Sequence, residues 1–155
     1  MILYPFGFIK TPALVVGQAY QGGIIVYLDG TGQHGLIKGT QLSGSATWGC
    51  RGTSISTSTA AGTGSTNTDN IVSVCTTSGI AAELCYNSTL NGYSDWYLPS
   101  RGDLGLAFAN GFTFPSWSSS QVGGNEAVYG DGGFPGYYQN TQKDADREVV
   151  PFRSF

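Results

Sequence analysis

The sequence predicts one α+β domain, and three observations lead to this fold class. A β-type apolar segment, Gly23–Leu28, comes early in the chain. Two helical patterns follow, at about residues 79–90 and 100–110, and the chain after Gly111 is rich in short β-type segments and glycine loops. Strands, then helices, then strands indicate α+β architecture rather than alternating βαβ units. The 155 residues fit one domain.

The first predicted element is a β-hairpin. The run Gly23–Leu28 is apolar, Asp29-Gly30 is a turn signal, and His34–Lys38 is the expected return strand. The next region, residues 53–67, contains almost no aliphatic side chains and consists largely of Ser, Thr and Gly. We therefore expect it to be a surface loop.

Two helices are expected next. Either Asn67 or Thr68 is a suitable cap for a short helix whose apolar residues lie between positions 71 and 75. A second helix, at about residues 79–90, places apolar side chains at i,i+4 spacing, which gives it one buried face. Asn91-Gly92 is a stop signal for that helix.

A strand-to-helix junction follows. Tyr93–Leu98 is rich in aromatic residues, as a short core strand is, and Pro99 ends it because proline has no N–H for a ladder. Ser100 is predicted to cap a helix that runs to Asn110. Asp103 stands three residues after Ser100, where the second member of a capping box belongs.

The C-terminal part is expected to be β-rich. Short strands are predicted at residues 116–120 and 127–129. After a Gly/Asp loop at 130–136, Tyr137-Tyr138 is expected to begin a further strand. The last predicted strand is at 148–155, where Pro151 indicates an edge or bulged strand. Trp96 and Trp117 are predicted core residues. Trp48 borders the polar loop and could be exposed.

The cysteines are Cys50, Cys75 and Cys85, and an odd number cannot pair completely within one chain. We expect one disulfide and one free thiol, with Cys75–Cys85 and Cys50–Cys75 as the candidate pairs. Three buried thiols are the alternative, since free cysteine is often buried.

Composition excludes several classes of function. Charged residues make up 11% of the chain, the net charge is −3, and no basic stripe is present, so we expect no nucleic-acid partner. No run of about 18 apolar residues exists, so we expect no membrane insertion. His34 is the only histidine and there is no CxxC motif, so no metal, cofactor or catalytic site is predicted. The apolar start, residues 1–16, is interpreted as an attachment arm.

Several motifs occur in an order that resembles a known family. They are Tyr20-Gln21-Gly22-Gly23-Ile24-Ile25, Gln33-His34-Gly35-Leu36-Ile37, Ala82-Glu83-Leu84-Cys85, the segment Asn91–Ser100, Trp117-Ser118-Ser119-Ser120 and the terminal Val150–Phe155. Together they resemble the C-terminal domain of Legionella collagen-like proteins, a bacterial and phage family. The resemblance extends from about Gly17 to Phe155, so we divide the chain into an arm, 1–16, and a lectin-like domain, 17–155.

The resemblance implies a C-type-lectin-like fold, related to phage variable receptor-binding proteins and to formylglycine-generating enzymes. Such a fold has two helices flanking a small twisted antiparallel sheet, long loops, and paired first and last strands that bring the termini together. It also implies extracellular recognition. The sugar-binding triplets of calcium-dependent lectins and the active-site cysteine segment of the enzymes are both missing, so neither calcium-dependent sugar binding nor catalysis is expected.

Three carboxylates, Asp144, Asp146 and Glu148, alternate along the sequence. In a strand this spacing would place them on one face, where they could cradle Ca²⁺. A solvated, charged strand edge that discourages edge-to-edge pairing is the interpretation we favour.

The predicted ligand-binding segment is Gln121–Asn140, which combines aromatic rings, amides and glycines. Flat apolar rings beside directional hydrogen-bonding groups are typical of surfaces that bind sugars and proteins. The residues predicted to contact the ligand are Asn125, Tyr129, Asp131, Tyr137, Tyr138 and Asn140.

The sequence therefore predicts a non-catalytic recognition module for a glycan or cell-surface receptor, at the tip of a fibre, stalk or adhesin. Its expected location is extracellular, on a cell surface or on a virion. The alternative is a structural subunit or cap of an oligomeric surface or virion fibre, in which the N-terminal arm joins copies into a homo-oligomer.

Overall fold

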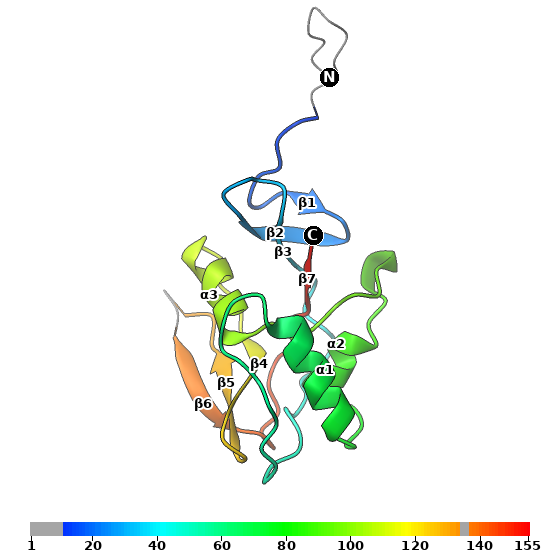
Figure 1. Cartoon of the computed structure of the whole chain (residues 1–155), viewed down its shortest axis with the longest axis vertical. Coiled ribbons are helices and arrows are strands. Elements are labelled where there is room, and N and C mark those ends of the chain that lie inside the picture. Colours follow the sequence, from blue (N-terminus) through cyan, green and yellow to red (C-terminus); the bar gives the residue numbers. More distant parts are fainter. Residues whose placement is uncertain (1–10, 134–136) are drawn as a thin grey trace, which may run out of the picture.

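The computed structural model describes residues 11–133 and 137–155 and confirms the α+β class (Figure 1). It differs from the expected two helices around one sheet. The described residues contain the three helices α1, α2 and α3, and the described strands form two separate antiparallel sheets. The elements are β1 (Ala19–Tyr20), β2 (Gly23–Leu28), β3 (Gly35–Lys38), α1 (Gly64–Val74), α2 (Ala81–Tyr86), the 3₁₀ turn η1 (Leu90–Gly92), α3 (Arg101–Ala109), β4 (Ser116–Val122), β5 (Glu126–Gly130), β6 (Tyr138–Gln142) and β7 (Phe152–Ser154).

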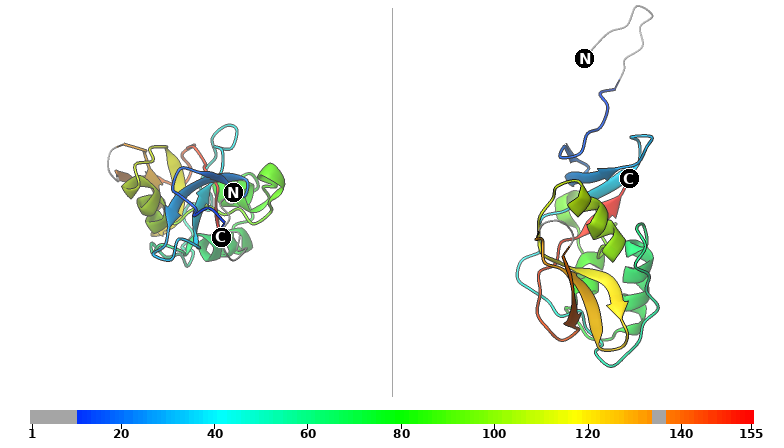
Figure 2. Two further views of the ribbon diagram at one scale, coloured as in Figure 1. Left: turned by 90° about the horizontal axis from the view of Figure 1, so that it is seen from above. Right: turned by 90° about the vertical axis from the view of Figure 1, so that its left-hand side faces the viewer.

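The first sheet has the strand order β1-β2-β3-β7, so the predicted hairpin is confirmed. The last strand pairs with β3 rather than with the first strand, as the Leu36↔Ser154 register shows. The two ends of the domain nevertheless meet, since the rings of Tyr20 and Phe155 pack edge to face with centroids 5.1 Å apart. The second sheet, β4-β5-β6, lies at the end of the domain away from β1 (Figures 1 and 2).

Helix α1 begins at Gly64, earlier than the cap predicted at Asn67 or Thr68. Both side chains are buried and have tertiary partners instead of capping the helix. The Asn67 amide oxygen accepts a hydrogen bond from the Ser58 N–H at 2.8 Å, and the Thr68 hydroxyl oxygen accepts one from the Leu98 N–H at 3.0 Å. The prediction was wrong because distant backbone groups compete for these side chains.

The segment Tyr93–Leu98 is not the expected strand. Only Tyr97 forms a β-bridge, in which it exchanges two backbone hydrogen bonds with Phe152. The next N–H, that of Leu98, binds the side chain of Thr68 and not another strand. The capping box that follows is confirmed, with Ser100 and Asp103 bonding each other's backbone N–H groups.

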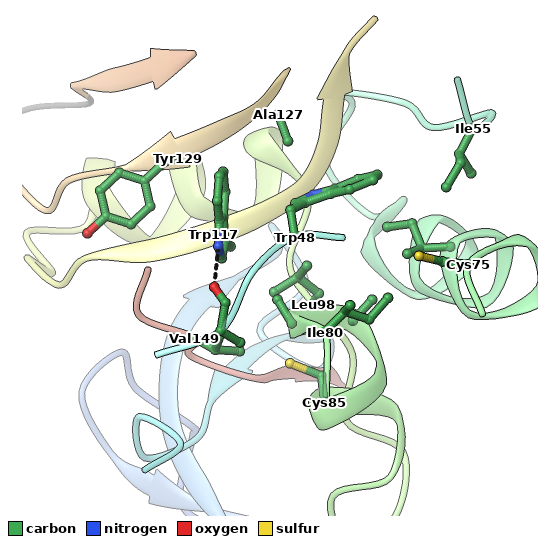
Figure 3. Close-up of a cluster of buried hydrophobic side chains, with 14 residues drawn as sticks. Trp48, Ile55, Cys75, Ile80, Cys85, Leu98, Trp117, Ala127, Tyr129 and Val149 are labelled. Carbon is green, nitrogen blue, oxygen red and sulfur yellow. Dashed lines mark hydrogen bonds between the residues drawn. The ribbon is translucent and has the colours of Figure 1, made fainter. Parts of the chain in front are cut away.

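The core contains all three tryptophans. Trp96 and Trp117 are buried as predicted, and Trp48 is buried as well, with 1% of its surface exposed. Figure 3 shows Trp48 and Trp117 in one apolar cluster beneath β4 and β5. Each indole N–H donates to a backbone carbonyl at 2.9 Å, Trp48 to Ser118 and Trp117 to Ala46. These buried carbonyls are the polar partners that an indole needs in a core.

The disulfide joins Cys50 to Cys75, with 5.7 Å between the two Cα atoms. Of the two candidate pairs, Cys75–Cys85 is therefore wrong. Cys85 lies on the inward face of α2, is fully buried and remains a free thiol. The bond connects the end of α1, where Cys75 is the C-cap, to the start of the polar loop.

The polar loop after Cys50 is held in place by the half-buried Gln121 of β4 and by the buried Lys143. Gln121 uses its amide oxygen to accept from the Ile55 N–H at 3.0 Å and from the Lys143 ammonium at 2.9 Å. Lys143 also donates to the Thr53 carbonyl, and its Nζ lies 4.3 Å from the centre of the Trp48 ring. Burial lowers the pKa of Lys143 to about 8. The loop is thus fixed by side chains in place of a regular ladder.

Candidate functional site

The predicted ligand-binding segment forms the β4–β5 turn, strands β5 and β6, and the connection between them. Strands β5 and β6 are antiparallel, and Gly130 is opposite Tyr138. Part of the predicted Gly/Asp loop, residues 134–136, lies outside the described residues. Strand β6 begins at Tyr138, as the sequence indicated.

Tyr138 lies between β6 and α3 and is the best-defined ring of the site. The Arg101 guanidinium carbon is 4.7 Å from the centre of its ring, and the buried Phe108 ring lies on it at 6.0 Å. Helix α3 can approach this closely because residue 105 is glycine, where an added Cβ would lie 3.0 Å from the Tyr138 hydroxyl. Partial burial raises the pKa of Tyr138, and the charge of Arg101 opposes that shift.

The residues around Tyr138 are accessible and polar. Tyr137 is 64% exposed, and Asn140 is exposed. One Asp131 oxygen accepts from the Gly133 N–H at 2.9 Å and the other accepts from the Gln139 side chain at 3.0 Å. The structure therefore brings Asp131, Tyr137, Tyr138 and Asn140 to neighbouring parts of strands β5 and β6. Tyr138 and Asn140 lie on the α3 side of the sheet, whereas Gln139 and its partner Asp131 lie on the other side.

Tyr129, in contrast, is a core residue. Its ring packs edge to face on Trp117 with centroids 5.8 Å apart, and Arg147 lies over the ring at 5.5 Å. Its hydroxyl donates to Glu148 at 2.6 Å, so burial and this carboxylate raise the pKa of Tyr129 while the same bond lowers that of Glu148. With 7% of its surface exposed, Tyr129 offers no ring face to a ligand.

Asn125 is also separated from the other predicted residues. It lies in the turn between β4 and β5, and its carbonyl accepts from the Lys143 N–H at 2.9 Å. Asp131 follows the opposite end of the five-residue strand β5. Five extended residues span roughly 17 Å, so Asn125 is not part of the same cluster.

The alternating carboxylates have separate partners. Asp144 forms an ion pair with Arg51 at 2.8 Å, and Glu148 accepts from Tyr129. They do not share a strand face, because residues 143–145 form a turn. Within residues 11–133 and 137–155, no three His, Cys, Asp or Glu side chains are grouped to hold a metal ion. The lone His34 is exposed, with Nδ1 3.3 Å from the Phe155 carbonyl oxygen.

Two members of the site were not predicted from the sequence, Arg101 and Gln139. The Ser100 cap places Arg101 in the first turn of α3, but local sequence does not show which strand faces that turn. Gln139 directly follows Tyr138. In a strand that starts at Tyr138, successive side chains point to opposite faces, so this alternation could have predicted that the Gln139 amide is exposed.

Comparison with known proteins gives this site no counterpart, because no protein-family model and no curated protein matches the chain. Among the helices of the described residues, none combines the length and the apolar character that crossing a lipid bilayer requires.

Proposed function

We propose that this protein is a non-catalytic extracellular recognition module that binds a glycan or a cell-surface receptor through the edge formed by Asp131 and residues 137–140. One observation carries the proposal: Tyr137, 64% exposed, immediately precedes Tyr138, whose own ring is stacked with Arg101. An exposed ring next to fixed polar groups is the combination with which sugar- and protein-binding surfaces gain contact area at low entropic cost.

The polar groups of this edge supply direction. The Asp131–Gln139 hydrogen bond orients a carboxylate and an amide toward each other, and Asn140 adds a second exposed amide. Within the described residues Arg101 forms no ion pair, so its N–H groups can donate to hydroxyl or carbonyl oxygens of a ligand. Stacking on Tyr138 limits the freedom of the guanidinium before a ligand arrives.

We further propose that the fold is C-type-lectin-like and that the module stands at the end of a fibre, stalk or adhesin. The return of β7 to the first sheet and the contact of Tyr20 with Phe155 support this architecture. The second sheet lies at the end of the domain away from β1, where a ligand surface is unobstructed by an attachment through the N-terminal side (Figure 1). The Cys50–Cys75 disulfide is compatible with an oxidising extracellular compartment.

A glycan array and a receptor-binding screen on whole cells test the proposal. We expect Tyr137→Ala to weaken binding about tenfold, because a stacked ring contributes about 1 kcal/mol or somewhat more. Tyr86→Ala is the matched control, since Tyr86 is 50% exposed but lies on α2. Equal binding by wild type and Tyr137→Ala would reject the site.

Exposed apolar residues just before β1 favour the alternative, structural function. Val15 and Val16, which precede β1, are 57% and 38% exposed, and the sequence before them is apolar. We propose as the second candidate function that the arm 1–16 joins copies within an oligomeric fibre. Only residues 11–16 of this arm lie within the described residues. Deletion of residues 1–10 should then abolish assembly while leaving the fold intact, and unchanged assembly would exclude this role.

A further inference from the structure

Strand β6 has an open edge, and we propose that it pairs with β6 of a second copy of this chain, forming an antiparallel two-fold interface. The second sheet has the order β4-β5-β6, so β6 has a neighbour on one side only. The proposal concerns a different surface from the N-terminal arm and does not depend on the identity of any ligand.

The other long sheet edges are covered from within the chain. On the outer side of β4, the Trp117 N–H donates to the Glu148 carbonyl and the Ser119 N–H donates to the Pro99 carbonyl. On the outer side of β7, Phe152 is bridged to Tyr97. In residues 11–133 and 137–155, the backbone groups of Tyr138–Thr141 have no backbone partner outside β5.

The phase of the ladder shows which groups of β6 face outward. The Asp131 N–H donates to the Tyr137 carbonyl, and bonded pairs alternate along an antiparallel ladder. Gln139 and Thr141 therefore exchange hydrogen bonds with β5, whereas the N–H and C=O groups of Tyr138 and Asn140 point to the open edge. Strand β4 agrees with this phase. Trp117 is opposite Tyr129, but its N–H bonds outward to Glu148, so the two residues are not a hydrogen-bonded pair. The backbone groups of Tyr129 therefore face β6, where they bond Gln139.

The edge is self-complementary. Its five residues, Tyr-Gln-Asn-Thr-Gln, carry no charge, although proteins commonly protect open edges with charged residues. In an antiparallel register centred on Asn140, the two Asn140 residues face each other as a hydrogen-bonded pair. Tyr138 then lies opposite Gln142 of the other copy, so no like charges meet and each outward backbone group gains a partner.

A second copy is favoured as the occupant because this edge can match itself. A two-fold interface uses the same patch on both partners, so it requires a self-complementary patch. Side-chain amides both donate and accept, so Gln and Asn can pair with their own kind across the axis. The contact would extend the three-stranded sheet to six strands and place two copies of the Arg101–Tyr138 cluster on one assembly. A weak, concentration-dependent dimer is expected, since one short strand pair buries little area.

The test introduces opposite charges at position 140, on the two-fold axis. The molecular mass of each variant is measured by light scattering after size exclusion and by sedimentation. The wild type should change from 16.3 kDa toward twice that mass as its concentration rises from the micromolar to the millimolar range. Asn140→Lys alone and Asn140→Asp alone should each stay monomeric, because two like charges would face each other. Their equimolar mixture should recover the dimer.

A wild type that remains monomeric at millimolar concentration overturns the proposal, as do single variants that dimerise as well as the wild type. Gln33→Lys and Gln33→Asp serve as controls because Gln33 is exposed in the β2–β3 turn, and both should dimerise normally. Circular dichroism of each variant confirms that the exposed substitutions leave the fold unchanged. Asn140 also belongs to the proposed recognition edge, so ligand binding is measured with Tyr137→Ala, which lies outside the paired strand. Failure of this interface and failure of the recognition proposal then give different results.

Discussion

Removing the Cys50–Cys75 disulfide should destabilise the domain by about 3.5 kcal/mol. The two cysteines are 25 residues apart in the sequence, and the chain-entropy relation converts a loop of that size to about this value at 25 °C. The loop that the bond closes includes the long polar segment, which has few backbone hydrogen bonds of its own. A domain of this size is stable by roughly 5–15 kcal/mol, so the loss would be a large share of the total.

Urea unfolding of the oxidised wild type, the reduced wild type and the Cys50→Ala/Cys75→Ala variant measures this loss. With a slope of about 2 kcal/mol per molar urea, the midpoint should fall by roughly 1.7 M in both altered forms. Cys85 provides an internal control, because it is buried and burial raises its thiol pKa. In the oxidised wild type, one thiol per chain should therefore react with a thiol reagent, and only after unfolding. Equal midpoints for the oxidised and reduced protein would refute the reasoning.

Two further predictions concern a buried arginine and a close backbone contact. The hydrogen bond from Arg153 lowers the pKa of Asp95, so the stability from this pair is fully present above the unfolded-state pKa of about 3.9 and is lost as pH falls through the lower folded-state value. In Asp95→Asn, the urea midpoint should therefore fall less steeply with decreasing pH below about pH 4 than in the wild type. Gly102→Ala places a Cβ 2.3 Å from the Ala61 nitrogen and should cost about 1–3 kcal/mol in urea unfolding.

Each of these two predictions has a clear contrary result. An acid slope that survives in Asp95→Asn would show that other carboxylates govern low-pH stability. For the glycine, Gly30→Ala is the control, because no atom lies within 4 Å of the added Cβ and the backbone there is not left-handed. Similar midpoints for Gly102→Ala and Gly30→Ala would mean that the loop over α3 moves aside without cost.

Elements whose signals are local could be predicted from the sequence. Strand β2 has the predicted bounds Gly23–Leu28, and the Ser100–Asp103 capping box forms as predicted, because turn and cap chemistry depends on neighbours a few residues away. The end of α1 illustrates the limit. Nothing near Asn67 shows that its side chain binds Ser58, or that the helix begins earlier, at Gly64.

Local sequence likewise places some residues of the candidate site and not others. Tyr137 and Tyr138 are adjacent in the chain, so their joint position at an edge follows from predicting a strand that starts there. Tyr129 has the same composition around it, but its ring is enclosed by Trp117 and Arg147, which come from other parts of the chain. Burial of one tyrosine among three in a short segment depends on those non-local contacts, and residue type does not distinguish them.

The hydroxyl-rich composition has a structural cause that connects the core to the site. The fully buried Ser120 hydroxyl donates to the Ser58 carbonyl of the polar loop at 2.8 Å and accepts from the Arg101 N–H at 3.0 Å. One small side chain thus joins β4, the loop and the first turn of α3, which carries the guanidinium that lies on Tyr138. A hydroxyl can do this inside a protein because it donates and accepts at once and adds no charge to be desolvated. Ser120 of β4 therefore fixes the backbone of Arg101 on the α3 side of the proposed recognition edge.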